Sequence, residues 1–131
     1  MNQEEYLEFI EKHPKITTHG FGVDADPHTK ISYEELFKEK REELKDSFQE
    51  FQYCCDWINL NPNFDGKVHA YHWKHRVQEW LEANEMRPSY IAQGVFILAA
   101  MYLGYKVRKM KNDTCATFGP RVQVKSPLPV A

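Results

Sequence analysis

The chain has 131 residues, of which 42 % are hydrophobic and 14 % aromatic, and its formal net charge at pH 7 is −2. A chain of this length and aromatic content can bury the core of a single domain, 1–131, so that folding does not depend on disulfides or a metal. Acidic residues are in excess before residue 53 and basic residues after it, which is typical of two solvated faces of one domain.

The cysteines and the apolar stretches indicate where the protein resides. The three cysteines, Cys54, Cys55 and Cys115, are not the even, spaced set of a disulfide framework, and are typical of a reducing compartment. The acidic N-terminal segment lacks the basic and apolar regions of a signal peptide. The longest apolar stretch, residues 90–104, is shorter than the roughly 20 residues that cross a bilayer. We therefore expect a cytoplasmic protein without membrane association.

The first predicted helix is short and is followed by a long loop. Asn2 can cap a helix over residues 3–12, and His13-Pro14 ends it. Residues 13–31 contain Gly, Pro, Asp and His without helical or alternating periodicity, so we expect an irregular segment there.

The second predicted helix is the longest. Ser32 and Glu35 form a capping box at its start, and a stripe of apolar residues extends to about Leu60. We expect this helix to kink or break near residues 53–54. A turn over residues 59–67, which contains Pro and Gly, ends it.

The third and fourth predicted helices surround the core. Residues 68–83 carry aromatic side chains for packing, and residues 90–104 are apolar on all sides, as in a helix that is covered all round. Pro88 or Ser89 is expected to open this central helix, and Gly104 to end it.

The C-terminal part is predicted to contain β-structure. Two short runs about a polar turn predict a β-hairpin over residues 105–118, which the alternating run 121–125 can extend, and residues 126–131 read as a frayed tail. The expected fold is mainly α, in the α+β class, with three to four helices around the buried central helix and a small C-terminal hairpin.

Gln93 is the one strongly polar side chain in the central helix, and Gly94 follows it. A buried amide without partners costs about 1–3 kcal/mol, and a helical Gly costs about 1 kcal/mol relative to Ala. Two such residues side by side indicate either close approach of another element or a functional pocket. The close-packing interpretation predicts that Gln93 hydrogen-bonds to the helix that carries His75.

Three histidines, His69, His72 and His75, recur at steps of three in the third helix. Two of them, His72 and His75, can converge on a metal ion, although no motif supplies a third ligand, and we expect no metal and no cofactor. His75 can alternatively act as a general base, with Cys54 or Cys55 as nucleophile. The alternative to both hypotheses is ordinary packing, since a free cysteine is most often a small buried hydrophobe.

A basic run lies on the predicted hairpin, formed by Lys106, Arg108, Lys109 and Lys111. Lys106 and Arg108 share one face of a strand and can straddle phosphates, but such a run is also ordinary for an exposed edge strand. A helix-turn-helix is rejected, because the apolar central helix cannot expose polar side chains to base edges.

Residues 70–105 contain a sequence motif that also occurs in a group of other proteins. Its residues are Tyr71, Lys74, His75, Glu79, Tyr90, Gly94, Phe96, Ala99, Ala100, Gly104 and Tyr105. In this pattern the chain resembles small uncharacterised proteins carried on bacterial phages, plasmids and integrated elements. Those proteins have Ser and Asn where this chain has Ala70 and Gln93. The resemblance implies a mobile-element setting and places Lys74, His75 and Gln93 in one motif, without implying an activity.

Two functions follow from these patterns. The first is a non-enzymatic accessory protein of a mobile element or phage that binds a macromolecule through its charged surfaces. Its partner is then most simply a protein, with nucleic acid at 106–111 as the alternative and a homo-oligomer compatible with exposed tryptophans. The second is a small enzyme or ligand-binding domain that uses a polar pocket of Tyr71, Lys74, His75, Glu79 and Gln93. The second function requires these side chains to line a solvent-reachable cavity; the first expects them buried and bonded to one another.

Overall fold

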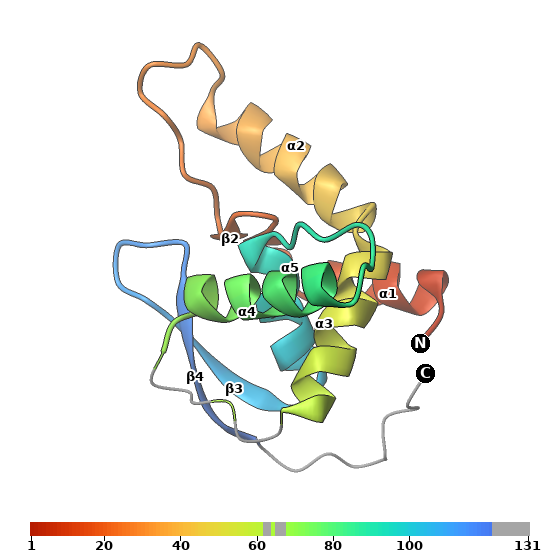
Figure 1. Ribbon diagram of the computed structural model, residues 1–131. Helices are drawn as coiled ribbons and strands as arrows, with labels where there is room; N and C mark the ends of the chain where they lie inside the picture. Colours follow the sequence, from red (N-terminus) through yellow and green to blue (C-terminus); the bar gives the residue numbers. More distant parts are fainter. Residues whose placement is uncertain (62–63, 65–67, 122–131) are drawn as a thin grey trace.

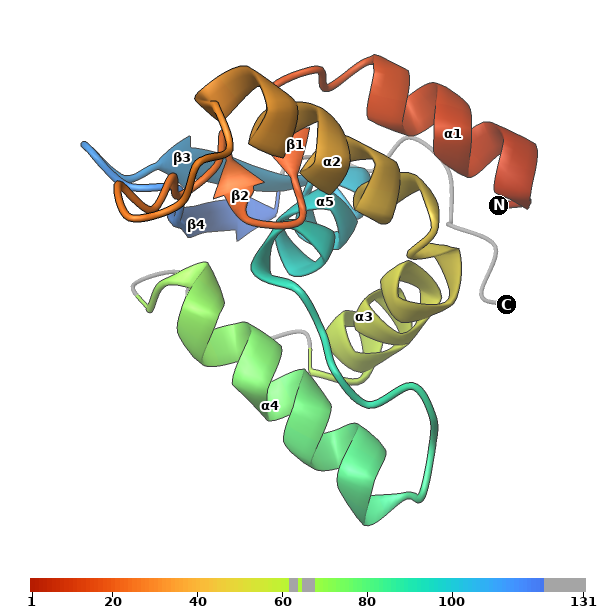
Figure 2. The same ribbon diagram turned by 90° about the horizontal axis from the view of Figure 1, so that it is seen from above.

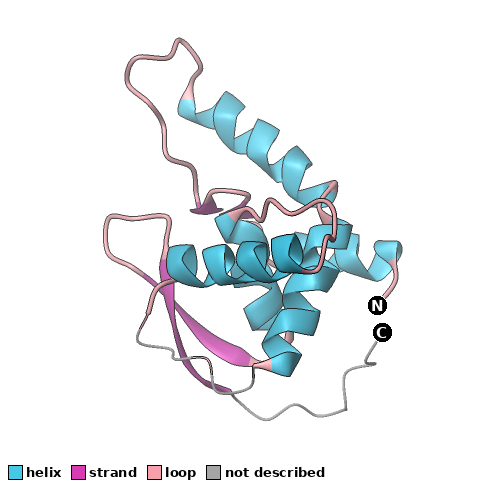
Figure 3. Cartoon of the chain, viewed as in Figure 1, coloured by secondary structure: helices cyan, strands magenta, loops and turns pink. Residues whose placement is uncertain are grey.

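The computed structural model describes residues 1–61, 64 and 68–121, and within them it contains five helices and two small antiparallel sheets (Figure 1; Figure 3). The elements in chain order are α1 (Gln3–Glu11), β1 (Ile16–Thr17), β2 (Gly20–Phe21), α2 (Tyr33–Lys45), α3 (Phe48–Leu60), α4 (Ala70–Ala83), α5 (Gln93–Tyr102), β3 (Tyr105–Lys109) and β4 (Ala116–Arg121). The predicted fold class, mainly α with a C-terminal hairpin, is confirmed.

Helix α5 is the centre of the core. Its residues from Gly94 to Ala100 are all buried, and α3, α4, β3 and the β1–β2 pair all contact it. Figure 2 shows α4 beside α5 on the side opposite to α1 and α2. Aromatic rings complete the packing, among them Trp57 and Phe118 against Phe96, with ring centroids 6.1 and 5.6 Å away. A helix apolar on all sides is thus buried on all sides, as its composition predicts.

The central helix begins later than predicted. Ala92 is its N-cap and has an extended backbone, so the expectation that Pro88 or Ser89 opens the helix is wrong. The reason is tertiary, because the side chain of Gln78 accepts the Ile91 backbone N–H at 3.0 Å and holds this segment extended. The predicted end is confirmed, since Gly104 follows the C-cap with φ of 90°, a conformation that favours glycine.

The predicted long helix is two helices, α2 and α3, and this raises the number of helices to five. The break lies at Asp46-Ser47, so the expected break near residues 53–54 is wrong. The Ser47 hydroxyl donates to the Glu43 carbonyl at 2.7 Å, a local bond that competes with helix continuation. The buried Tyr6 hydroxyl from α1 donates to the Leu44 carbonyl at 2.6 Å and anchors the end of α2. This contact cannot be inferred from the local pattern.

The segment 13–31, predicted as irregular throughout, contains the strands β1 and β2. Ile16 pairs with Phe21 and Thr17 with Gly20, in strands too short to show an alternating pattern. The pair is held from outside, because the Arg41 guanidinium donates to the carbonyls of His13 and Ile16, both at 2.9 Å. The remaining residues of this segment form turns and loops, as predicted.

The C-terminal hairpin is confirmed, with Val107 opposite Phe118 and an irregularity between Tyr105 and Val107. Residues 62, 63 and 65–67 of the predicted turn 59–67 lie outside the described residues, as do residues 122–125 of the predicted run 121–125 and the tail 126–131. Across the part of the chain that the structure describes, no helix combines the length and apolar character that a membrane span requires.

Gly94 packs against the backbone of the β1–β2 pair. Its N–H donates to the Thr18 carbonyl at 3.0 Å, and a Cβ added at this position would overlap the Thr17 carbonyl oxygen. Close approach of another element, one of the two explanations for the Gln93-Gly94 pair, is therefore what the structure shows.

We expect Gly94→Ala to destabilise the protein although alanine is the better helix former. The gain in helix propensity is about 1 kcal/mol, whereas forcing a methyl group into packed backbone costs about 1–3 kcal/mol or more. Because the neighbour is a backbone carbonyl, the second effect should win. Urea unfolding measures the difference.

The matched control is Gly119→Ala on β4, where an added Cβ would lie 3.1 Å from the Cβ of the exposed Lys106. Its expected effect is below about 1 kcal/mol. Equal effects of the two substitutions would contradict the close contact at Gly94.

Candidate functional site

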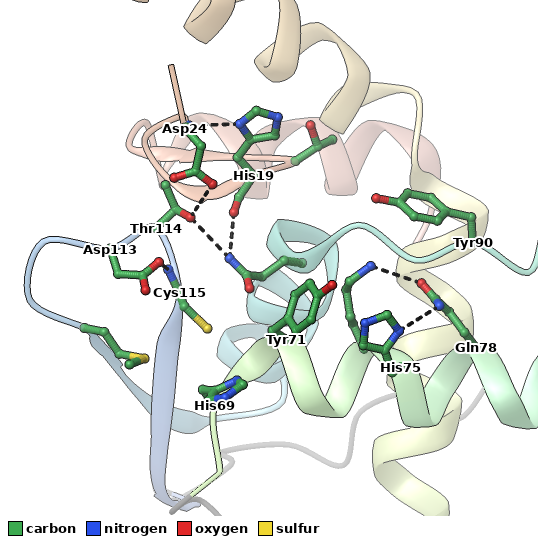
Figure 4. Close-up of a pocket in the computed structure, with 14 residues that line it drawn as sticks. His19, Asp24, His69, Tyr71, His75, Gln78, Tyr90, Asp113, Thr114 and Cys115 are labelled. Atoms are coloured by element: carbon green, nitrogen blue, oxygen red, sulfur yellow. Dashed lines mark hydrogen bonds between the residues drawn. The ribbon is translucent and has the colours of Figure 1, made fainter. Parts of the chain in front are cut away.

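A cavity of about 660 Å³ opens between α4 and the two hairpins (Figure 4). One wall is the face of α4 that carries Lys74, and the other combines the β1–β2 turn, the start of α5 and the loop between β3 and β4. Among the described residues the lining is Thr18, His19, Asp24, His69, Tyr71, Lys74, His75, Gln78, Tyr90, Gln93, Met110, Asp113, Thr114 and Cys115. Segments far apart in the sequence therefore meet at one site.

Lys74 is the most unusual residue of the site. Its side chain lines the cavity, yet the residue is only 5 % exposed. Its Nζ donates to Gln78 Oε1 at 3.2 Å and to the Ile91 carbonyl at 3.1 Å, and lies 4.6 Å from the centroid of the Tyr90 ring and 5.3 Å from that of Tyr71. No carboxylate of the described residues forms an ion pair with it. Burial lowers the pKa of the Lys74 amine, since the charged form loses hydration.

Gln78 joins Lys74 to His75 along the same helix. Its Oε1 accepts from Lys74 Nζ and from the Ile91 N–H, and its Nε2 lies 3.1 Å from His75 Nδ1. With the amide in this orientation Nε2 donates, so His75 Nδ1 accepts and the imidazole is neutral. Burial and then the nearby Lys74 charge lower the pKa of His75, against the opposing effect of Glu79. The hydrogen bond from Gln78 and the lowered pKa therefore both favour a neutral His75 imidazole.

The opposite wall is held together by Gln93. Its Nε2 donates to the His19 carbonyl at 2.7 Å and approaches Thr114 Oγ1 at 3.4 Å. Thr114 Oγ1 in turn donates to Asp24 Oδ2 at 3.1 Å. The prediction that Gln93 bonds to the His75 helix is wrong, because at the first turn of α5 its side chain meets the two hairpins instead. Its Oε1 accepts no hydrogen bond from the described residues and remains open to a ligand.

Of the five residues predicted for a polar pocket, four line this cavity: Tyr71, Lys74, His75 and Gln93. Glu79 does not. It pairs with Arg76 at 2.9 Å and borders a second cavity, of about 580 Å³, that shares His75, Gln78 and Tyr90 with the first.

The two histidines of the metal hypothesis, His72 and His75, lie in different surroundings. His75 lines the cavity, whereas His72 lies outside its lining and packs on Trp73 with ring centroids 4.8 Å apart. Within residues 1–61, 64 and 68–121, no group of three or more His, Cys, Asp or Glu side chains is placed to hold a metal ion.

The structure does not bring Cys54 or Cys55 to His75, since neither lines the cavity. Burial raises the pKa of both thiols, which disfavours the nucleophilic thiolate. Cys115 does line the cavity and is 6 % exposed. The cysteines of the nucleophile hypothesis are therefore packing residues of α3.

Sequence reasoning missed Gln78, His19 and Thr114. Gln78 had a usable signal, because it stands four residues after Lys74 and three after His75, and such neighbours share one helix face. His19 and Thr114 lie in turns that only the folded chain brings to α5.

The predicted basic residues Lys106, Arg108, Lys109 and Lys111 are all exposed and none lines the cavity. Lys109 Nζ donates to the carbonyl of its neighbour Met110 at 3.2 Å. Comparisons with models of known protein families, with curated proteins and with solved structures find no significant match to this chain.

We expect the protein to lose stability as the pH falls from 7.5 to 5.5. Burial lowers the folded-state pKa of His13, His19 and His75, so below pH 6.5 the unfolded chain binds protons that the folded chain does not. Stability from such groups is complete above the unfolded pKa and declines as the pH falls toward the folded pKa. Unfolding in urea across this range measures the decline.

His19 should contribute a separable part of this decline, because its Nδ1 accepts the Asp24 N–H at 3.0 Å. His19→Asn retains an acceptor and does not titrate, so its stability should depend less on pH than that of the wild type. His28→Asn, on the exposed loop, is the control and should leave the pH dependence unchanged. The reverse ranking would contradict a neutral His19 in the folded state.

Proposed function

We propose that this chain is a ligand-binding domain whose cavity takes a small molecule with an anionic group, a carboxylate or a phosphate, that pairs with Lys74. The observation that carries the proposal is a buried ammonium whose two hydrogen-bond acceptors, Gln78 Oε1 and the Ile91 carbonyl, are both neutral. An anion entering the cavity would supply the missing counter-charge.

Energetics favour a functional reason for this lysine. A charged side chain that is buried without an opposite charge costs free energy, and proteins rarely retain one for packing alone. Titratable groups whose pKa is shifted and which lie in a cleft are typical of binding and catalytic sites. Two tyrosine rings offset part of the cost through cation–π contacts, but they supply no net negative charge.

The rest of the cavity suits a small organic molecule. Its volume lies within the roughly 300–1,000 Å³ typical of ligand pockets. The rings of Tyr71 and Tyr90 offer apolar surface beside the Lys74 amine. Gln93 Oε1 supplies a free acceptor on the facing wall. An anionic group at Lys74 and a hydrogen-bond donor toward Gln93 would fix the orientation of such a ligand.

The accessory role in a mobile element and the macromolecular partner stay predictions. The four basic residues proposed to contact such a partner are exposed: Lys106, Arg108, Lys109 and Lys111. Binding of a small ligand is compatible with both. It requires neither catalysis nor a nucleic-acid partner.

The test is thermal unfolding of the wild type in inorganic phosphate, acetate or succinate at constant ionic strength. We expect at least one of these anions to raise the melting temperature by a saturable amount, since a ligand that binds only the folded state stabilises it. Lys74→Met should abolish this response. Lys106→Met, with the same charge change on exposed β3, should retain it.

Lys74→Met should also unfold no more easily than the wild type at pH 7 without added anion, because an apolar side chain of similar length replaces an uncompensated buried charge. A loss of more than about 3 kcal/mol would mark Lys74 as a structural residue. An anion response that is equal in the wild type and in Lys74→Met would contradict the proposed site.

A further inference from the structure

The amine of Lys74 is placed for covalent chemistry as well as for ion pairing. We propose that Lys74 forms an imine with a carbonyl compound in the cavity, and that the ligand class is an aldehyde or ketone with a carboxylate next to its carbonyl group. This inference rests on the proposed function, because it names the ligand of the same site.

The hydrogen bonds of Nζ suit the neutral amine. A neutral primary amine has two N–H groups and one lone pair, and Lys74 Nζ has two acceptors, Gln78 Oε1 at 3.2 Å and the Ile91 carbonyl at 3.1 Å. Both bonds can therefore persist when the ammonium loses its third proton. The lone pair then occupies the remaining tetrahedral position, at the end of a side chain that belongs to the cavity lining.

The surroundings of Lys74 make that neutral form easier to reach than it is for a solvated lysine. Its acceptors carry no charge, and burial lowers the pKa of the amine. Loss of hydration is a recognised way to activate a lysine amine as a nucleophile. The aromatic rings at 4.6 and 5.3 Å from Nζ exclude water from that side of the amine and also tolerate the cation that forms later.

The chemistry balances without an oxidant, reductant or metal. The Nζ lone pair attacks the carbonyl carbon, a C–N bond forms, and the electron pair of the C=O π bond moves to oxygen, which takes a proton. The nitrogen loses one proton, giving a carbinolamine. The C–O bond then breaks, the hydroxyl leaves as water after protonation, and the nitrogen lone pair forms the C=N bond. The products are one protonated imine and one water.

Tyr71 can supply the proton for the departing hydroxyl. Its ring lies 5.3 Å from Lys74 Nζ and 4.6 Å from the His75 ring. Neutral His75 accepts at Nδ1 from Gln78, so its Nε2–H can donate a hydrogen bond to the hydroxyl but does not transfer the proton.

The carboxylate of the ligand explains how one lysine can serve both proposals. A protonated imine keeps the positive charge of the ammonium at the same atom. A carboxylate bonded to the former carbonyl carbon lies beside that charge, so the ion pair survives the covalent step. A simple aldehyde lacks this contribution.

The experiment treats the wild-type chain with glyoxylate and sodium cyanoborohydride at pH 7 and maps the modified lysines by mass spectrometry. Hydride reduction converts the imine into a stable carboxymethyl amine. We expect Lys74 to be modified faster than any exposed lysine, because a lowered pKa leaves a larger fraction of its amine neutral at pH 7. Acetaldehyde, the matched probe without a carboxylate, should modify Lys74 more slowly.

Lys74→Arg keeps a cation at the site and should lose this fast modification, while its circular dichroism spectrum stays that of the wild type. Modification spread over exposed lysines, with Lys74 unmodified, would overturn the imine even if phosphate or acetate still stabilises the protein. Equal rates of Lys74 modification by glyoxylate and acetaldehyde would support the imine and contradict the anion site. The two proposals therefore fail separately.

Discussion

The contact between the start of α5 and the β1–β2 pair is the constraint on which the site depends. Gly94 lies directly against the Thr17 carbonyl, and no residue with a Cβ fits there without displacement of the backbone. This approach places Gln93 where one amide group reaches both His19 and Thr114. The wall that faces α4 is therefore built from three segments, joined by backbone packing at Gly94, by the Gln93 amide and by the hydrogen bond from Thr114 to Asp24.

The second wall of the cavity, the face of α4, carries the buried amine of Lys74. Lys74, Gln78 and His75 lie on one face of α4, and the Gln78 side chain also holds the extended segment before α5 through the Ile91 N–H. The same amide thus shapes the start of the central helix and orients the buried amine. A cation that is buried without a carboxylate lowers the stability of the fold. The neighbouring aromatic rings and the Ile91 carbonyl offset part of this cost, and an anionic ligand would offset more of it.

Local patterns predicted the parts of this protein that local physics determines. The all-round apolar composition of 90–104 predicted a buried helix, of which residues 94–100 are buried, and two short runs about a polar turn predicted the β3–β4 hairpin. Tyr71, Lys74 and His75, which one of the two hypotheses from the sequence placed in a polar pocket, line the cavity. The break between α2 and α3, the late start of α5 and the partners of Gln93 depend on contacts between distant segments, and no local pattern encodes these contacts.

The most direct test of the central claim, that Lys74 is a buried amine without a counter-charge, is an NMR titration of its ε-carbon in protein labelled with ¹³C-lysine. Lys74→Arg identifies the resonance by its absence. The account predicts that the Lys74 resonance titrates with a pKa below the ordinary 10.5. A Lys74 resonance that titrates together with the exposed lysines would contradict the account.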